Sequence, residues 1–549
     1  MVLPLSYIAI LYSLAIAVIA GDAPSAVVKA GTVVGVTTTL PSSTAVVNKF
    51  LGIPYAQPPT NERRFLPPQP LASFTQNPVN ATAWGSKCFM TQYNSRTFFQ
   101  NRPANCAPHS LTIVYISSED DGIPESEDCL YLNVYAPAAV GCSLSGRPVL
   151  LWIHGGWLRS GTASQHMFDG SSFASEHGIV VVTFNYRLNV FGFPNSPQLP
   201  LDAQNLGFLD QRLVLAWVQA NIHAFGGDPS KVTIAGESSG ASSVDRLVTT
   251  LHTSAPFRAA ACSSGQATVS AIGRDSGPQS WAALAFLLGC SGQDEIACVR
   301  GIDAETVRAM ANNLDFSPVN DNITQKELPY LPTRAAGGLA RVPLLIGSTG
   351  QEGTYLAPAY GLDISSFTEP ALIQVLGLFT GDNPELTNGI LQVIQLIQQT
   401  TGLSLFHAAA QVYTDIVYQC VTRTNIPTWR YFYNASFPNL AAEGYTSEEL
   451  LSSHGSDTVM IWGTYPKEGA TDRQIRLSRY LQSVWAGFVK NPSGTGPGWR
   501  EVDVDGHNIA CIGCGGDDEA VPIASPTIDG RCPLYAPYFD QVKTPFVRV

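Results

Sequence analysis

The sequence predicts an α/β fold with a mainly parallel central sheet flanked by helices. Continuous apolar runs at Val149–Ile153 and Ile179–Phe184, and a shorter one at Leu344–Ile346, are typical of strands that are covered on both faces. Between the last two runs, apolar residues recur with a helical period and are expected to share one helix face: Leu209, Leu213, Ala216, Trp217 and Ala220. Strands that alternate with helices form mainly parallel sheets.

Size and composition are those of a globular protein with a neutral or uncharged partner. The 549 residues contain no repeat and no low-complexity tract, and no Pro/Gly-rich stretch is long enough to be an interdomain linker. We therefore expect one continuous domain over residues 21–549. The net charge of −12, with only 13% charged residues, argues against nucleic-acid binding, because neutralising phosphates needs clustered Lys and Arg.

The N-terminus predicts export. An apolar core from Ile8 to Ile19 precedes small residues, which indicates a signal peptide over residues 1–20 that is cleaved after Ala20. Cleavage after Ala23 is the alternative. A signal anchor is less favoured because the core is short, and no later stretch is long and apolar enough to span a bilayer. Eleven cysteines suit an oxidising compartment, and export would make Asn80, Asn322 and Asn434 glycosylation acceptors.

A candidate nucleophile stands between an expected strand and an expected helix. Gly236 to Gly240 spell G-x-S-x-G around Ser238; the β-branched run Val232–Ala235 precedes them, and a helix is expected from Ala241 to Leu251. A serine on such a sharp turn is held in a strained conformation with its hydroxyl clear of the sheet edge. The alternative is an ordinary Gly/Ser turn.

A second glycine turn follows the strand that ends at Ile153. His154-Gly155-Gly156-Trp157 would allow successive N–H groups to point at one spot, as a developing oxyanion requires. Because reactive groups gather at the carboxyl ends of parallel strands, this turn and Ser238 are expected to meet. A Gly-Gly turn without catalytic meaning is the alternative.

Several long motifs then occur in order along almost the whole mature chain: Phe50–Ala56 with Arg64 and Phe65, Ser126–Val134, Asn185–Arg187, Asn205–Arg212 and Phe225–Pro229. In these motifs the chain resembles the type-B carboxylesterase/lipase family, the cholinesterase-like branch of the α/β-hydrolases, as a secreted fungal-type member. The resemblance implies the α/β-hydrolase fold, with long loop insertions.

The resemblance also implies an acid and a base. Gly347–Gly353 matches the family pattern G-x-x-x-x-E-G, so Glu352 is the expected acid, and His454-Gly455-Ser456-Asp457 matches H-G-x-D/E, so His454 is the expected base. The order Ser238, Glu352, His454 is the hydrolase order of nucleophile, acid and base.

The backbone N–H groups of Gly156, Trp157 and Ser239 are the implied oxyanion hole. The family usually has glycine or another small residue in place of Trp157, and alanine in place of Ser239. An indole there is expected to narrow or re-aim the acyl pocket. The resemblance further implies the scaffold pairs Arg64–Glu127 and Arg187–Asp210, a negative potential from Glu237, and Ser264 as a residue that orients the triad.

For the cysteines, the resemblance pairs Cys88 with Cys129 and Cys290 with Cys298, and Cys106 could pair with Cys142. An odd count leaves at least one thiol unpaired or bonded to another chain. His507, Cys511, Cys514 and Cys532 could suggest a zinc site, but in an exported protein a disulfide from Cys511 or Cys514 to Cys532 is favoured.

Together these features predict a secreted, extracellular serine esterase that hydrolyses neutral carboxylic esters through an acyl-enzyme, with no cofactor and no metal. The expected partner is a small-molecule or lipid ester, with no nucleic acid and no stable membrane span. One alternative is a true lipase that acts on long-chain acylglycerols or sterol esters at an interface. Another is a catalytically silent binding or adhesion module. The natural ester and the oligomeric state are left open by the sequence.

Overall fold

The computed structural model describes residues 23–91, 122–138, 146–251, 253–266, 278–292, 294–325, 338–380, 383–421, 428–442, 444–503 and 508–538. The expected signal peptide, Cys106, Cys142 and His507 lie outside these residues.

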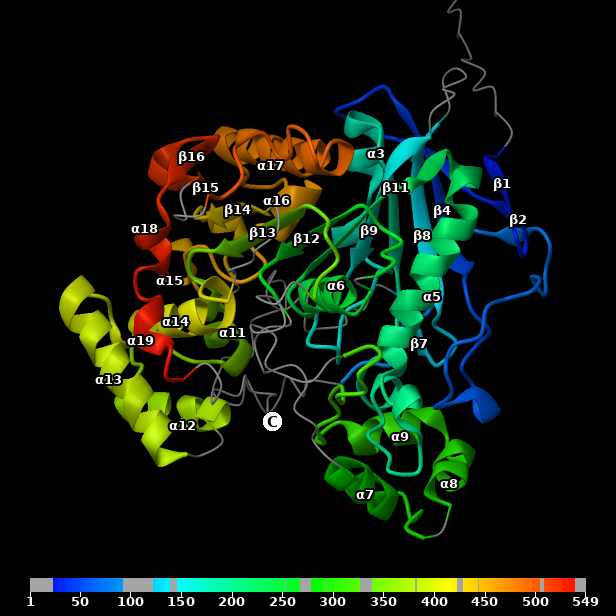
Figure 1. Ribbon diagram of the computed structural model, residues 1–549, viewed down its shortest axis with the longest axis horizontal. Coiled ribbons are helices and arrows are strands. Elements are labelled where there is room, and N and C mark those ends of the chain that lie inside the picture. The colour runs from blue at the N-terminus through cyan, green and yellow to red at the C-terminus, as the bar shows by residue number, and fades with distance from the viewer. Residues whose placement is uncertain are drawn as a thin grey trace, which may run out of the picture.

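An eleven-stranded mixed sheet forms the centre of the molecule (Figure 1). Its strands, in spatial order, are β16 (Ala520–Ile523), β15 (Ile509–Ile512), β14 (Thr428–Tyr433), β13 (Leu344–Thr349), β12 (Ala259–Ser263), β11 (Gly227–Glu237), β9 (Arg147–Ile153), β10 (Val180–Phe184), β8 (Tyr131–Pro137), β4 (Val46–Pro54) and β3 (Val36–Thr39). All strands from β15 to β10 run parallel, whereas β16 at one edge and β8, β4 and β3 at the other pair antiparallel. The prediction of a mainly parallel sheet is confirmed. The smaller sheets contain β1 (Ser25–Val28), β2 (Gly31–Val34) and β5 (Val79–Asn80), and β6 (Lys87–Cys88) and β7 (Glu125–Ser126).

The described helices are α3 (Ser171–His177), α4 (Asn189–Gly192), α5 (Leu206–Asn221), α6 (Ser239–Thr250), α7 (Pro278–Leu287), α8 (Glu295–Gly301), α9 (Ala304–Ala311), α11 (Leu356–Tyr360), α12 (Glu369–Thr380), α13 (Pro384–Thr401), α14 (Leu405–Thr414), α15 (Ser447–Leu450), α16 (Thr458–Trp462), α17 (Asp472–Lys490), α18 (Ser525–Asp529) and α19 (Cys532–Tyr535). Short helical turns are η1 (Asn61–Arg63), η2 (His166–Phe168), η3 (Leu201–Ala203), η4 (Ile222–Phe225), η5 (Glu352–Tyr355), η6 (Asp415–Gln419, a π-helix), η7 (Pro438–Leu440) and η8 (Cys514–Gly516).

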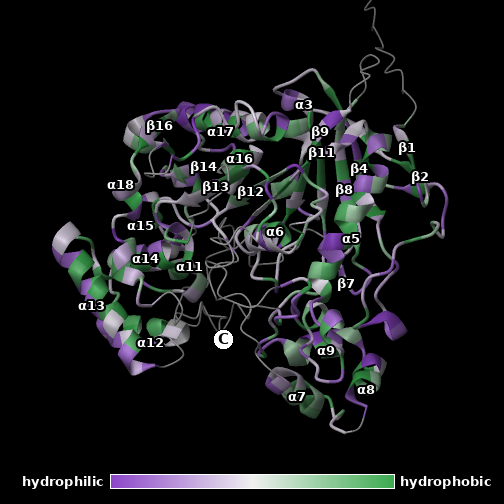
Figure 2. Cartoon of the chain, viewed as in Figure 1, coloured by the Kyte–Doolittle hydropathy of each residue, from purple (hydrophilic) through white to green (hydrophobic). Residues whose placement is uncertain are grey.

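The alternation of side chains along the strands divides the core into two layers. Val149 and Leu151 of β9 face one layer, which α5 and α6 cover, while Leu150 and Trp152 face the other, which α3, α16 and α17 cover. In Figure 2 the central strands are mostly hydrophobic, whereas an outer helix such as α13 shows both hydrophilic and hydrophobic residues. Burial on both faces explains why the predicted strands read as continuous apolar runs.

The helix expected from the period between Leu209 and Ala220 is α5, but only part of its predicted face lies in the core, where Trp217 is buried. Ala216 is exposed, and Leu209 and Leu213 are half-buried. The helix also buries Val214 and Val218, together with three polar residues. Asp210 pairs with Arg187, Gln211 donates to the hydroxyl of Ser243 at 3.2 Å, and Asn221 donates to the Trp217 carbonyl. Hydrophobicity alone misplaces this face, because part of it is polar and hydrogen-bonded.

Two groups of helices lie beyond the same edge of the central sheet, below it in Figure 1. The first contains α7 to α9, and the second contains α11 to α14. The second group forms between β13 and β14 and has its own apolar core, to which Cys532 and Tyr535 of α19 also belong.

The cysteines of the C-terminal region pair differently from the expectation. Cys532 is bonded to Cys420, and Cys511 to Cys514, so the expected disulfide from Cys511 or Cys514 to Cys532 is wrong. The physical reason is where α19 docks: the Arg531 guanidinium and the Tyr535 hydroxyl both donate to the buried carboxylate of Asp415 in η6, which places Cys532 beside Cys420.

Candidate active site

Ser238 stands at a strained turn between β11 and α6. Its backbone has φ 56° and ψ −127°, a combination that costs energy in any residue with a Cβ and that clusters at functional sites. The turn is tight because glycine flanks it: a Cβ on Gly240 would lie 2.1 Å from the carbonyl oxygen of Ile153 at the end of β9. The sequence pattern therefore reflects close packing of the turn against the neighbouring strand.

The second glycine turn lies directly against this serine. A Cβ on Gly155 would lie 3.0 Å from the Cβ of Ser238, so only a glycine allows the two turns to touch. Gly156 (φ 106°) and Trp157 (φ 58°) both adopt positive φ, and the Gly156 carbonyl accepts from the N–H groups of Arg159 and Ser160, which fixes the turn. Ser239 is the first residue of α6, so its N–H has no partner within the helix. Gly156, Trp157 and Ser239 thus remain the candidate donors of an oxyanion hole.

Glu352 is held by three hydrogen bonds and is fully buried. Its Oε1 accepts from the Ser264 hydroxyl and from the Thr349 N–H, both at 2.6 Å. Its Oε2 lies 2.6 Å from Nδ1 of His454. Because a carboxylate only accepts, Nδ1 carries a proton, and the neutral imidazole leaves Nε2 as the proton acceptor. The carried-over acid and base are therefore in contact, and Ser264 contacts the acid as the resemblance implies.

The other imidazole nitrogen faces Glu237, the residue before Ser238. Nε2 of His454 lies 3.2 Å from Oε1 of Glu237, which is buried at the end of β11. Among the described residues, no hydrogen bond joins the Ser238 hydroxyl to His454. Burial by itself lowers the pKa of His454. The charge of Glu237, the hydrogen bond that Nδ1 donates to Glu352, and the charges of Glu352 and Asp457 outweigh burial and raise this pKa to about 9. The surroundings of His454 therefore favour the protonated imidazolium over the neutral imidazole.

Two tyrosine rings flank the same imidazole, and the sequence analysis missed both. The ring of Tyr355 lies 5.2 Å from that of His454, and the ring of Tyr418 lies 5.0 Å from it. Tyr355 follows Glu352 in η5, so its proximity could have been suspected from the acid motif. Tyr418 comes from the π-helix η6, and no local pattern marks it.

A buried network supports the turn that carries His454. The Asp457 carboxylate accepts from the hydroxyls of Ser263 and Tyr431, each at 2.8 Å. Burial raises the pKa of Asp457, and the nearby Glu352 adds to this effect. The network joins the His454 turn to β12 and β14, which lie on either side of β13.

His154 has a structural role. Its ring stacks on that of Tyr186 at 4.4 Å, and its Nδ1 donates to the Gly155 carbonyl at 2.9 Å. Burial lowers its pKa to about 4, so it stays neutral at physiological pH.

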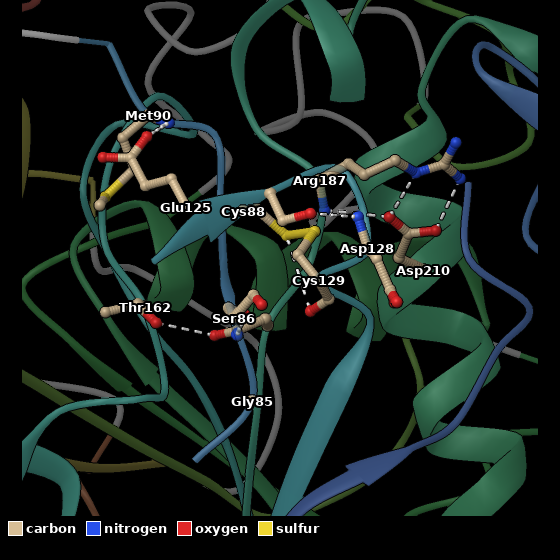
Figure 3. The surroundings of a disulfide bond; sticks show 12 residues. Gly85, Ser86, Cys88, Met90, Glu125, Asp128, Cys129, Thr162, Arg187 and Asp210 are labelled. Carbon is tan, nitrogen blue, oxygen red and sulfur yellow. Dashed lines mark hydrogen bonds and ion pairs between the residues drawn. A yellow bond between two sulfur atoms is a disulfide. The ribbon is translucent and has the colours of Figure 1, made fainter. Parts of the chain in front are cut away.

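The scaffold ion pairs and the first two disulfides are formed. Arg64 pairs with the half-buried Glu127, and Arg187 pairs with the buried Asp210, each in a bidentate contact. Figure 3 shows the second pair beside the disulfide between Cys88 and Cys129. Cys290 is bonded to Cys298, and Cys262 is a buried free thiol.

The three asparagines of the sequons, Asn80, Asn322 and Asn434, are all exposed, while their glycosylation stays a prediction. In the described part of the chain, no group of three His, Cys, Asp or Glu side chains is arranged to hold a metal ion. No helix in the same residues is both long enough and apolar enough to cross a bilayer.

Comparison with known proteins is consistent with this geometry. The model of the carboxylesterase family matches residues 22–514. Para-nitrobenzyl esterase of Bacillus subtilis is 30% identical over 82% of this chain and 88% of its own length. Carboxylesterase 5A of Felis catus is 31% identical over 87% and 89%, and liver carboxylesterase 1 of Mus musculus is 32% identical over 86% of each chain. The chain belongs to the carboxylesterase family and is a carboxylic ester hydrolase with the α/β-hydrolase fold.

Proposed function

We propose that this hydrolase is a secreted serine esterase that cleaves neutral carboxylic esters through an acyl-enzyme on Ser238. The observation that carries the proposal is the 2.6 Å contact between Glu352 and His454 beside a serine on a strained turn. The test is labelling by a fluorophosphonate probe, which reacts with activated serine hydroxyls, followed by identification of the modified peptide. Modification at another residue, or none with a folded protein, would refute the assignment.

The reaction would proceed in two halves. The Ser238 oxygen attacks the ester carbonyl while Nε2 of His454 takes the hydroxyl proton, and the oxyanion accepts from the N–H groups of the glycine turn and α6. The bond to the alkoxy oxygen then breaks, and the imidazolium gives its proton to the leaving alcohol. Water, deprotonated by His454, attacks the acyl-enzyme and releases the acid together with the restored serine.

Glu237 is expected to set the pH dependence of this reaction. His454 acts as a base only when neutral, so kcat/KM should rise as pH increases through the imidazole pKa, which Glu237 holds high. In Glu237→Gln the amide no longer favours the imidazolium, although Glu352 and Asp457 still do. The rising limb should therefore move to lower pH, by about one unit or more. Profiles of kcat/KM for p-nitrophenyl acetate from acid to alkaline pH measure the shift.

The matched control for this experiment is Glu448→Gln, which removes an exposed carboxylate on α15 near His454 in sequence. Its profile should superimpose on that of the wild type. If kcat/KM of Glu237→Gln rises at the same pH as that of the wild type, the charge of Glu237 does not control the pKa of His454.

Secretion is supported by the apolar segment from Ile8 to Ile19, by the disulfides and by three exposed sequons. Expression in a eukaryotic secretory host should release a protein that begins at residue 21 or 24 and shrinks on endoglycosidase treatment. Asn80→Gln, Asn322→Gln and Asn434→Gln should each remove one glycan. Recovery of the full N-terminus in the membrane fraction would instead indicate a signal anchor.

One alternative remains distinguishable. A true lipase would accelerate sharply when a neutral ester series passes its solubility limit and droplets form. The silent binding or adhesion module does not agree with the family assignment, because the chain is a carboxylic ester hydrolase.

A further inference from the structure

A buried serine ties the turn that carries His454 to the turn that carries Glu352. Ser452 lies two residues before His454. Its carbonyl accepts from the Gln351 N–H at 3.1 Å, and its hydroxyl oxygen accepts from the Gly350 N–H, also at 3.1 Å. Two hydrogen bonds of Ser452 therefore reach the two residues that precede the catalytic acid.

The hydroxyl proton of Ser452 has a third partner, at the end of a neighbouring strand. It is donated to Oδ1 of Asn434 at 3.2 Å, because an amide oxygen can only accept. Asn434 follows β14 directly, and its own N–H donates to the Ile512 carbonyl of β15 at 2.9 Å, which fixes its backbone. The Ser452 hydroxyl thus joins Gly350 to Asn434, and we call these three residues the serine bridge.

The serine bridge is closely packed. A Cβ on Gly350 would lie 2.6 Å from Oδ1 of Asn434 and 2.7 Å from Oγ of Ser452, so a larger residue would push the two polar atoms away. Leu451, just before Ser452, has φ 52° and ψ −141°, a combination that costs energy in a residue with a Cβ. Such a backbone persists only where surrounding contacts hold it, and the bonds of Ser452 are contacts of this kind.

We propose that Ser452 is a positioning residue, which keeps the imidazole of His454 in register with the Glu352 carboxylate. Only Ser453 separates Ser452 from His454, so a shift at the serine bridge would move the imidazole. It would lengthen the 2.6 Å contact between Nδ1 and Glu352 and change the direction of Nε2. A misplacement of about 1 Å can lower a rate by about 10²-fold. The inference rests on the proposed serine esterase function and deepens it.

Ser452→Ala removes the serine bridge, and Ser453→Ala is the matched control. Ser453 is also buried beside His454, but its hydroxyl makes no hydrogen bond among the described residues. We would measure kcat and KM for p-nitrophenyl acetate, with active enzyme counted by fluorophosphonate titration to its end point, so that unfolded protein does not enter kcat. In Ser452→Ala, kcat should fall about ten- to hundredfold while KM stays within about twofold, because the bridge acts through the base. Ser453→Ala should keep both values.

The other end of the serine bridge needs two variants, because Asn434 is also an expected glycosylation acceptor. Ser436→Ala removes the sequon and leaves the Asn434 side chain in place, whereas Asn434→Leu removes both. Asn434→Leu should lower kcat about three- to tenfold, since the Gly350 N–H still reaches the hydroxyl. Ser436→Ala should keep the wild-type kcat. An equal fall in both variants would assign the effect to the glycan and overturn the proposal.

The double variant Ser452→Ala/Asn434→Leu tests whether the two residues act through one link. Its kcat should equal that of Ser452→Ala, because Asn434 has no hydroxyl left to hold, and two effects that multiply would overturn the bridge. An unchanged kcat in folded Ser452→Ala, or an equal fall in Ser453→Ala, would also overturn the proposal. Absence of any ester turnover by the wild type would instead refute the serine esterase function itself.

Discussion

Ser238→Ala should abolish fluorophosphonate labelling and lower kcat for p-nitrophenyl acetate by about 10⁴- to 10⁶-fold. The residual rate would come from the oxyanion hole and substrate binding, which survive the loss of the nucleophile. Alanine meets the same backbone strain as serine at φ 56°, so the variant should fold with nearly unchanged thermal stability. The measurement is steady-state turnover together with probe labelling of the purified protein.

The control for this variant is Ser242→Ala, which removes another buried hydroxyl one turn further along α6. That hydroxyl donates to the Gln266 carbonyl and has no expected part in catalysis. Ser242→Ala should keep activity and labelling within a few-fold of the wild type. Near-normal turnover by a folded Ser238→Ala enzyme would show that the nucleophile is another residue.

The sequence predicted the site best where function depends on short, local motifs. Ser238 and Glu352 each follow a predicted strand, and parallel neighbours bring the ends of such strands to one edge of the sheet. His454 could be placed only by resemblance, because it lies in a turn with no predicted strand before it. His454 contacts Glu352 and lies 3.2 Å from Glu237, the neighbour of Ser238, so the three motifs meet in space, while their catalytic roles stay predictions.

Features that depend on packing between distant segments were missed or misplaced. Tyr418 reaches the imidazole because a π-helix redirects the chain after α14, and no residue pattern announces that change. The bond from Cys420 to Cys532 spans 112 residues and follows from the docking of α19. Part of the buried face of α5 was misplaced for a related reason, since buried Asp210 has its partner on another element.

Glu352→Gln should lower kcat/KM at neutral pH by about 10³- to 10⁴-fold, although it only replaces one carboxylate oxygen with an NH₂ group. The reason is the orientation of the new amide. Ser264 and the Thr349 backbone both donate to the Oε1 position, so the amide oxygen must occupy it and the NH₂ must face His454. That NH₂ donates to Nδ1 and moves the imidazole proton to Nε2, where it blocks proton transfer from Ser238.

Fluorophosphonate labelling of Glu352→Gln should slow by a similar factor, because labelling uses the same general base. Ser264→Ala is the informative comparison: it removes one donor to Oε1 but leaves the carboxylate and the Nδ1 proton in place, so its loss should be only about tenfold. If Glu352→Gln proved as active as Ser264→Ala while remaining folded, the tautomer of His454 would not depend on Glu352. Glu237, which lies 3.2 Å from Nε2, would then be the carboxylate that governs the base.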